Sequence, residues 1–184
     1  MHVLVSAGKS LGEDDVLVAN WGLHPGAVDA LPMALRWWAE QRARGRALPA
    51  LVWRETSARH WPASSGYLDT SACVPFGASA DRDEPDANTA GAFAKAAAAA
   101  ELSVGDGRVE TLPVHAPSRP RHDEHPVLYW YHRPKAQQQM LRNNGSYVAD
   151  CTHICEQSST FRMYNAALLT LLARLRRTRD VRWR

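Results

Sequence analysis

The sequence alternates short apolar segments with longer segments of helical periodicity, and this alternation restricts the fold more than any other feature. The short segments are rich in aliphatic side chains, as buried strands are: residues 15–20, 48–53 and 109–114. The longer segments have apolar side chains at helical spacing or a high alanine content: residues 27–44, 88–102 and 160–177. A helix between two strands allows the strands to run parallel. The order therefore predicts an α/β fold with a parallel sheet.

The composition fits one globular domain. The chain has 184 residues, of which 45% are hydrophobic and 22% are charged, so it can bury a core. We expect a single domain over residues 1–184, in which residues 78–108 form a variable insertion with the alanine-rich helix. The formal net charge is only +3 and arginines gather near the C-terminus, so no nucleic-acid partner is expected. No apolar run reaches the roughly 18 residues that a membrane-spanning helix needs.

Polar residues and glycines follow two of the expected strands. Asn20, Gly22 and His24 come after the first strand, and Arg54 and Ser57 come after the second. In parallel sheets, ligands bind beyond the carboxyl ends of the strands. We therefore expect these residues to lie near one site. Arg54 could bind an anionic or sugar ligand there, or form a structural ion pair.

The segment before the last helix carries an acid three residues before a histidine. Asp150 and His153 lie in the sequence Asp-Cys-Thr-His-Ile-Cys at residues 150–155. A carboxylate beside an imidazole fixes the tautomer of the ring, and the ring can then take a proton from a nucleophile. The spacing predicts the orienting acid and the general base of a hydrolytic triad. The sequence shows no convincing nucleophile to complete it.

Three blocks in chain order resemble the PC-esterase branch of the SGNH/GDSL-type hydrolases, which includes the trichome-birefringence-like polysaccharide O-acetyltransferases. Residues 15–24 (DVLVANWGLH) are similar to the family's strand followed by Asn-x-Gly. Residues 51–61 (LVWRETSARHW) with Gly66 and Tyr67 look like its W-R-E-T-S-x-x-H-F … G-Y block. Residues 150–155 look like its D-C-x-H-W-C block, with isoleucine where an aromatic residue is usual. The apolar-aromatic segment 127–133, which contains His132, resembles the stretch before that block.

The resemblance implies an SGNH-like three-layer α/β/α sandwich around a parallel sheet, with a Ser-His-Asp triad. His153 would be the general base and Asp150 its orienting acid. Asn20 and Gly22 would help to line the oxyanion pocket, where hydrogen-bond donors stabilise the tetrahedral intermediate. His24, Arg54 and His60 would be further lining residues, and packing is the alternative role for His60.

The same resemblance implies an O-acyl transferase or esterase, most often for acetyl groups. The reaction would run through an acyl-serine intermediate on the hydroxyls of a glycan. The partners would be a glycan acceptor and an acyl donor, with no cofactor and no metal. Family members work in the Golgi lumen or are secreted, and the complete form could be membrane-anchored.

The sequence departs from the family at the nucleophile. The family's Gly-Asp-Ser motif is absent, and Gly8-Lys9-Ser10 is only similar to it. Ser10 lies too close to Asp15 for a helical crossover between parallel strands, which needs about a dozen residues. We therefore expect this sequence to be the C-terminal part of a longer protein, with a sheet that is incomplete at its N-terminal side. The alternatives to an enzyme are a glycan-binding remnant without chemistry and a fragment without function.

The cysteines and histidines leave several alternatives open. The chain has three cysteines, and Cys73 would pair with Cys151 or Cys155, as disulfides in lumenal members of the family suggest. Cys151, His153 and Cys155 could instead ligate zinc, although four ligands are usual. Four histidines lie in or near a loop rich in proline and arginine: His115, His122, His125 and His132. We expect those of the loop to be exposed rather than to bind a metal.

Overall fold

The computed structural model describes residues 11–20, 27–62, 73–79, 90–125, 151, 154–155 and 157–182, without the side chains of residues 27–30 and 179–182. By its internal contacts the chain divides into two compact units. The sheet unit consists of Met1–Thr56, Asp86–Pro113 and Leu168–Arg184. The second unit consists of Ser57–Pro85 and Val114–Ala167.

The sheet unit contains three strands, β1 (Val16–Ala19), β2 (Ala50–Arg54) and β3 (Val109–Leu112). They lie in the order β1-β2-β3, and both pairs are parallel. Helix α1 (Ala27–Ala43) follows β1, and helix α2 (Ala90–Ala99) lies between β2 and β3 in the sequence. The long helix α5 (Ser159–Arg182) ends the described chain. The predicted α/β fold with a parallel sheet is therefore confirmed.

One face of the sheet packs against α1 and α2. Leu51 and Trp53 of β2 join Val109 of β3 in the hydrophobic core of this unit. The Trp53 ring stacks on Phe93 of α2, with ring centroids 5.1 Å apart and planes 4° apart. Ala97 of α2 is fully buried in the same core.

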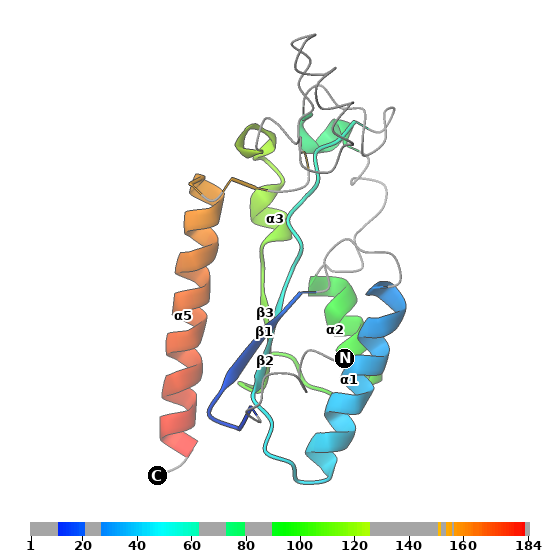
Figure 1. Cartoon of the computed structure of the whole chain (residues 1–184), viewed down its shortest axis with the longest axis vertical. Coiled ribbons are helices and arrows are strands. Elements are labelled where there is room, and N and C mark those ends of the chain that lie inside the picture. Colours follow the sequence, from blue (N-terminus) through cyan, green and yellow to red (C-terminus); the bar gives the residue numbers. More distant parts are fainter. Residues whose placement is uncertain are drawn as a thin grey trace, which may run out of the picture. The chain divides into compact units, whose positions relative to one another are not determined.

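The C-terminal part of α5 covers the other face of the sheet. Arg174 of α5 donates to Glu110 of β3 at 2.7 Å. Successive side chains of a strand point to opposite faces of the sheet, and Val109, directly before Glu110, points into the core beneath α1 and α2. Leu171 and Leu175 are the buried apolar side chains of this part of the helix. Within the sheet unit, Figure 1 shows α1 and α2 on one side of the strands and this part of α5 on the other.

Burial falls from the central strand to β1. All of Ala50–Trp53 in β2 is buried, as expected for a parallel strand covered on both faces. In β1, Val18 is 42% exposed, and its neighbours are half-buried. The sheet is thus best covered at its centre.

The second unit is built from short helical turns. Among the described residues they are η2 (Phe76–Ala78), α3 (His115–Ser118) and η4 (His122–Glu124), and the last two lie where the sequence predicted a loop rich in proline and arginine. The first turns of α5 also belong to this unit, where the Tyr164 hydroxyl donates to the Val114 carbonyl at 3.1 Å. None of the helices in the described ranges is both long and apolar enough to cross a membrane.

Candidate functional site

Asn20 lies at the carboxyl end of β1 and joins it to the chain beyond β2. Its Nδ2 group donates to the Arg54 carbonyl at 2.8 Å and to the Thr56 hydroxyl at 3.0 Å. An amide nitrogen has two hydrogens, so both of them have acceptors within the sheet unit. The structure therefore brings Asn20 next to the backbone of Arg54. The two hydrogen bonds that Asn20 donates hold the ends of β1 and β2 in register.

Glu55, in the Trp-Arg-Glu-Thr-Ser block, supports a helix. This side chain is only 5% exposed, and its carboxylate accepts the backbone N–H of Ala90, the first residue of α2. Its own N–H donates to the Leu112 carbonyl at 3.1 Å. A carboxylate at a helix N-terminus satisfies an unpaired N–H and interacts favourably with the helix dipole. Glu55 thus fixes where α2 begins relative to the sheet.

His60 is fully buried in the second unit, with 0% exposure. Its Nε2 lies 3.0 Å from the Arg119 carbonyl, and its Nδ1 lies 2.6 Å from Nε2 of His125. Because a carbonyl only accepts, Nε2 of His60 carries the proton, and Nδ1 of a neutral His60 accepts from His125. Both ring nitrogens are occupied, which favours the packing role for His60 over the lining role.

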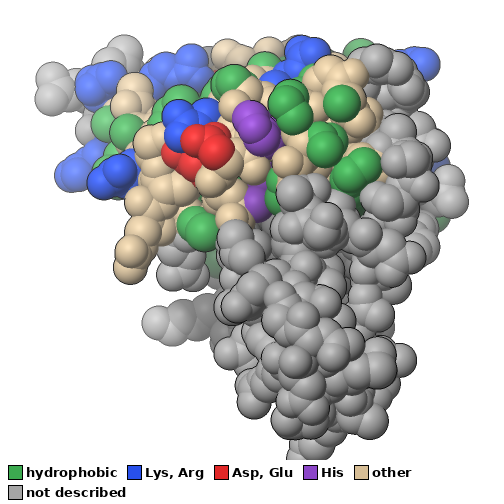
Figure 2. All heavy atoms as spheres, turned by 90° about the horizontal axis from the view of Figure 1, so that it is seen from above, with side chains coloured by type: hydrophobic (Ala, Val, Ile, Leu, Met, Phe, Trp, Pro, Cys, Tyr) green, Lys and Arg blue, Asp and Glu red, His purple; other side chains and the backbone are tan. Residues whose placement is uncertain are grey.

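His125 corrects an expectation. We expected the histidines of the loop at residues 115–126 to be exposed, but His125 is only 6% exposed because its ring contacts His60. His115 and His122 are half-buried. The His115 ring packs edge-on against the Phe76 ring, and the Arg119 guanidinium lies 4.2 Å from the centre of the Phe76 ring. Figure 2 shows histidine, charged and hydrophobic side chains side by side on one face of the molecule.

A disulfide joins Cys73 to Cys151, whose Cα atoms are 5.3 Å apart. The Cys151 carbonyl also accepts the backbone N–H of His60 at 2.8 Å. Cys155 is half-buried and forms no disulfide, and its N–H donates to the Glu124 carbonyl at 3.0 Å. A disulfide-bonded Cys151 cannot serve as a zinc ligand, so the proposed zinc set loses a member. The described ranges hold no cluster of three or more acidic, histidine or cysteine side chains suited to a metal ion.

Four of the predicted site residues lie outside the described residues: Gly22, His24, Asp150 and His153. Ser10, His132 and the aromatic residues Trp21, Tyr129 and Trp130 also lie outside them. The described residues next to the proposed acid–base pair are Cys151, directly after Asp150, and Ile154, directly after His153; the disulfide and the His60 N–H hold Cys151 in place. The roles of Asp150 and His153 remain predictions.

Glu124 is a structurally important residue that sequence reasoning missed. Its carboxylate accepts the N–H of Ser159 at 3.2 Å and that of Thr160 at 3.0 Å, and it also accepts the Ser159 hydroxyl. Burial raises the pKa of this carboxyl, but hydrogen bonds from Ser159 and Thr160, together with the charge of Arg121, lower the pKa to about 2. Glu124 therefore caps α5 as an anion. It lies 35 residues before Ser159, so no local motif could reveal it.

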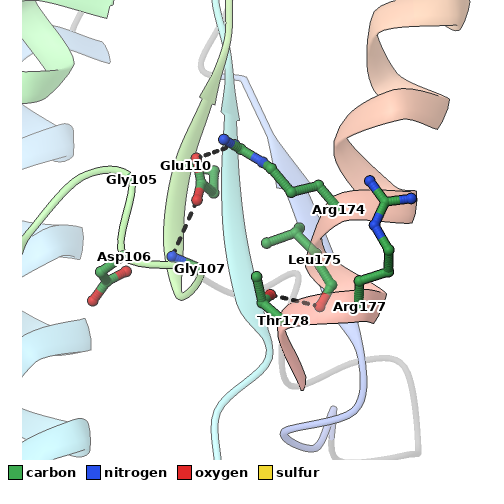
Figure 3. Close-up of a pocket in the computed structure, with 8 residues that line it drawn as sticks. All are labelled: Gly105, Asp106, Gly107, Glu110, Arg174, Leu175, Arg177 and Thr178. Carbon is green, nitrogen blue, oxygen red and sulfur yellow. Dashed lines mark hydrogen bonds and ion pairs between the residues drawn. The ribbon is translucent and has the colours of Figure 1, made fainter. Parts of the chain in front are cut away.

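Among the described residues of the sheet unit, two cavities lie near the amino ends of the strands. One of about 500 Å³ is lined by residues 105–107 before β3, by Glu110, and by residues of α5. Figure 3 shows Glu110 between the Gly107 N–H and the Arg174 guanidinium, with Leu175 and Thr178 on the opposite wall. A second cavity of about 420 Å³ lies between α1 and residues 100–106, with Glu40, Arg42, Glu101 and Asp106 in its wall. None of the predicted site residues lines these two cavities.

Hydrogen bonds of Asn20 and Glu55 thus fix the backbone at the carboxyl ends of the strands, where the site was predicted. In the second unit, the disulfide and the His60 N–H anchor the chain at Cys151, between Asp150 and His153. Comparison of the chain with family models, curated proteins and solved structures found no match.

Proposed function

We propose that this chain carries the acid–base pair of an O-acyl transfer site that acts on the hydroxyls of a glycan. The observation that carries the proposal is the double anchor at Cys151, which lies directly after Asp150 and two residues before His153. A disulfide to Cys73 and the N–H of His60 both hold this residue, which is 3% exposed. Catalytic side chains need supporting contacts that restrict their positions, and this anchor supplies one.

The proposed chemistry divides between the two side chains. His153 takes the proton of a serine hydroxyl as the serine oxygen attacks an ester carbonyl, and Asp150 orients the ring. The tetrahedral intermediate then collapses, and His153 returns the proton to the leaving alkoxide. In the second half, water or a sugar hydroxyl loses a proton to His153 as its oxygen attacks the acyl carbonyl, and His153 then returns this proton to the serine oxygen as the acyl–serine bond breaks. The first product is a free hydroxyl, and the second is an acid or a new ester.

The fold supports this proposal at a coarser level. A parallel sheet with helices on both faces is compatible with the proposed SGNH-like three-layer sandwich, in which catalytic residues follow the strands. The disulfide supports a secreted or lumenal setting, since disulfides persist in oxidising compartments. For Asn20, whose two N–H hydrogens have acceptors, we propose that it supports the sheet edge rather than donating to an oxyanion.

Labelling with a fluorophosphonate tests the proposal, because this class of reagent phosphonylates serines that a neighbouring base activates. Because this sequence itself shows no convincing nucleophile, the test uses a protein that contains this chain together with a Gly-Asp-Ser segment, and we expect one labelled serine, in that segment, identified by peptide mass spectrometry. His153→Ala should slow the labelling by about a hundredfold or more, which is the usual contribution of a general base. His122→Ala is the matched control, because His122 is a half-buried histidine outside the motif. Labelling that is absent, or equally fast in His153→Ala, would contradict the acyl-transfer proposal.

A second candidate function is glycan binding without chemistry. The observation that favours it is the lack of a Gly-Asp-Ser motif in this sequence. Aromatic rings are the side chains on which sugars stack, and the sequence offers Trp21, Trp53, Trp61, Tyr129 and Trp130 for this role. Trp53 is fully buried in the core and cannot reach a ligand. Calorimetric titration with an acetylated oligosaccharide separates the two functions. Saturable binding without serine labelling and without release of acetate would support the binding function.

A further inference from the structure

A third cavity of the sheet unit is bordered by three arginines from three parts of the fold. Its volume is about 360 Å³. Arg42 comes from the last turn of α1, Arg46 from the turn after that helix, and Arg108 from the residue before β3. Glu13 is the carboxylate in its wall. Three positive charges and one negative charge leave this wall with an excess of positive charge.

The backbone that carries these arginines is held in place. After α1, the Gly45 N–H donates to the Arg42 carbonyl at 2.9 Å, and the Arg46 N–H donates to the Gln41 carbonyl at 3.1 Å. Gly45 has a φ of +71°, which glycine adopts without strain and which ends the helix. Before β3, the Arg108 N–H donates to the Asp106 carboxylate at 2.7 Å, and the Arg108 carbonyl accepts the N–H of Leu51 in β2 at 2.8 Å.

The charges of this wall are only partly neutralised. Arg42 lies 3.7 Å from Asp106, so it is paired with a carboxylate. For Arg46 and Arg108 no ion pair occurs within the described part of the chain. The two cavities described above lack such an excess of positive charge. In the cavity of about 500 Å³, Glu110 neutralises Arg174, and in the cavity of about 420 Å³, three carboxylates face a single arginine. A concave site lined by unbalanced charge of one sign concentrates ions of the opposite sign.

We propose that this cavity binds a phosphate dianion, either free phosphate or the phosphoryl group of a phosphomonoester. Guanidinium groups offer planar pairs of N–H donors that match phosphate oxygens, and Arg46 and Arg108 leave the wall with an excess of positive charge over Glu13 that attracts an anion. The site lies at the amino ends of the strands, at the edge of the sheet opposite to Asn20. It is therefore independent of the proposed acyl transfer.

Calorimetric titration of the full chain tests this site. The probes are inorganic phosphate and glucose 1-phosphate, used at low ionic strength, where charge interactions are screened least. We expect saturable binding of one equivalent. Arg46→Ala and Arg108→Ala should each weaken it about tenfold or more, because hydrogen bonds to charged groups are lost. Arg44→Ala is the matched control, because Arg44 is 65% exposed, pairs with Glu40 and does not line the cavity.

Each outcome decides the proposal. Equal affinity for the two probes would mean that the cavity contacts only the phosphoryl group. Tighter binding of glucose 1-phosphate would mean that it also contacts the sugar, and both outcomes support the site. Absence of saturable binding for both probes overturns it. Equal weakening by Arg44→Ala also overturns it, because a general surface charge would then be responsible. Arg46 is exposed, so the test does not depend on Arg108→Ala folding, which circular dichroism checks.

Discussion

At the scale of single residues, the clearest case is the start of α5, where every early N–H has an acceptor. Glu124 accepts the N–H groups of Ser159 and Thr160, and the Ser158 hydroxyl accepts that of Phe161 at 3.0 Å. The first intrahelical bond follows, from the Arg162 N–H to the Ser158 carbonyl. Unpaired N–H groups at a helix start are costly when they are buried. A carboxylate from another part of the chain thus completes the helix.

Glu124→Gln should therefore destabilise the protein by about 1 kcal/mol at pH 7, the usual cost of a lost cap. The folded pKa of about 2 lies below the ordinary 4.5, so the ionised form stabilises the fold. This stabilisation is fully present above pH 4.5 and is lost as the pH falls towards 2. Urea unfolding at several pH values measures it, and the Gln variant should lose this part of the pH dependence.

The control for this prediction is Asp123→Asn, which removes the same charge from the neighbouring residue. Asp123 is 61% exposed and pairs with Arg121 at 3.3 Å, so its loss should cost little. If both variants unfold at the same urea concentration as the wild type, Glu124 does not stabilise α5.

At the scale of elements, the strands and helices were predictable because their hydrophobic periodicity is a local property. β1, β2 and β3 each begin within two residues of the expected start, and α1 covers nearly the whole expected range. The short helical turns of the second unit were missed, because they lack an apolar repeat. Contacts between distant segments were also beyond local patterns. The His60–His125 pair, 65 residues apart, depends on how the second unit folds as a whole, and so does the choice of Cys151 as the partner of Cys73.

The alanine-rich helix gives a prediction at the same scale. Residues 78–108, the expected variable insertion with the alanine-rich helix, contain α2, which places Phe93 and Ala97 at 0% exposure in the core of the sheet unit. Ala97→Leu should overpack this core and cost about 1–3 kcal/mol of unfolding free energy, measured in urea. Ala98→Leu adds the same side chain at an exposed position of the same helix, so it should change stability by about 0.5 kcal/mol or less. Equal effects would show that α2 does not pack as described.

At the scale of the whole molecule, the disulfide constrains more than the unit that contains it. Cys73 and Cys151 both belong to the second unit, but they lie 78 residues apart. The chain between them includes α2 and β3, which belong to the sheet unit. A cross-link limits the conformations of the unfolded chain over the whole loop that it closes. Its stabilisation therefore acts on the folding of both units.

Replacement of Cys73 and Cys151 by serine should consequently lower the unfolding free energy by about 4.5 kcal/mol, the loop-entropy value for a closed loop of this length. Urea unfolding without reductant measures the loss. Cys155→Ser is the control, because Cys155 forms no disulfide among the described residues, and it should leave stability nearly unchanged. Reduction of the wild-type chain should reproduce the double variant and leave that variant unaffected. A double variant as stable as the wild type would mean that the cross-link does not limit the unfolded chain.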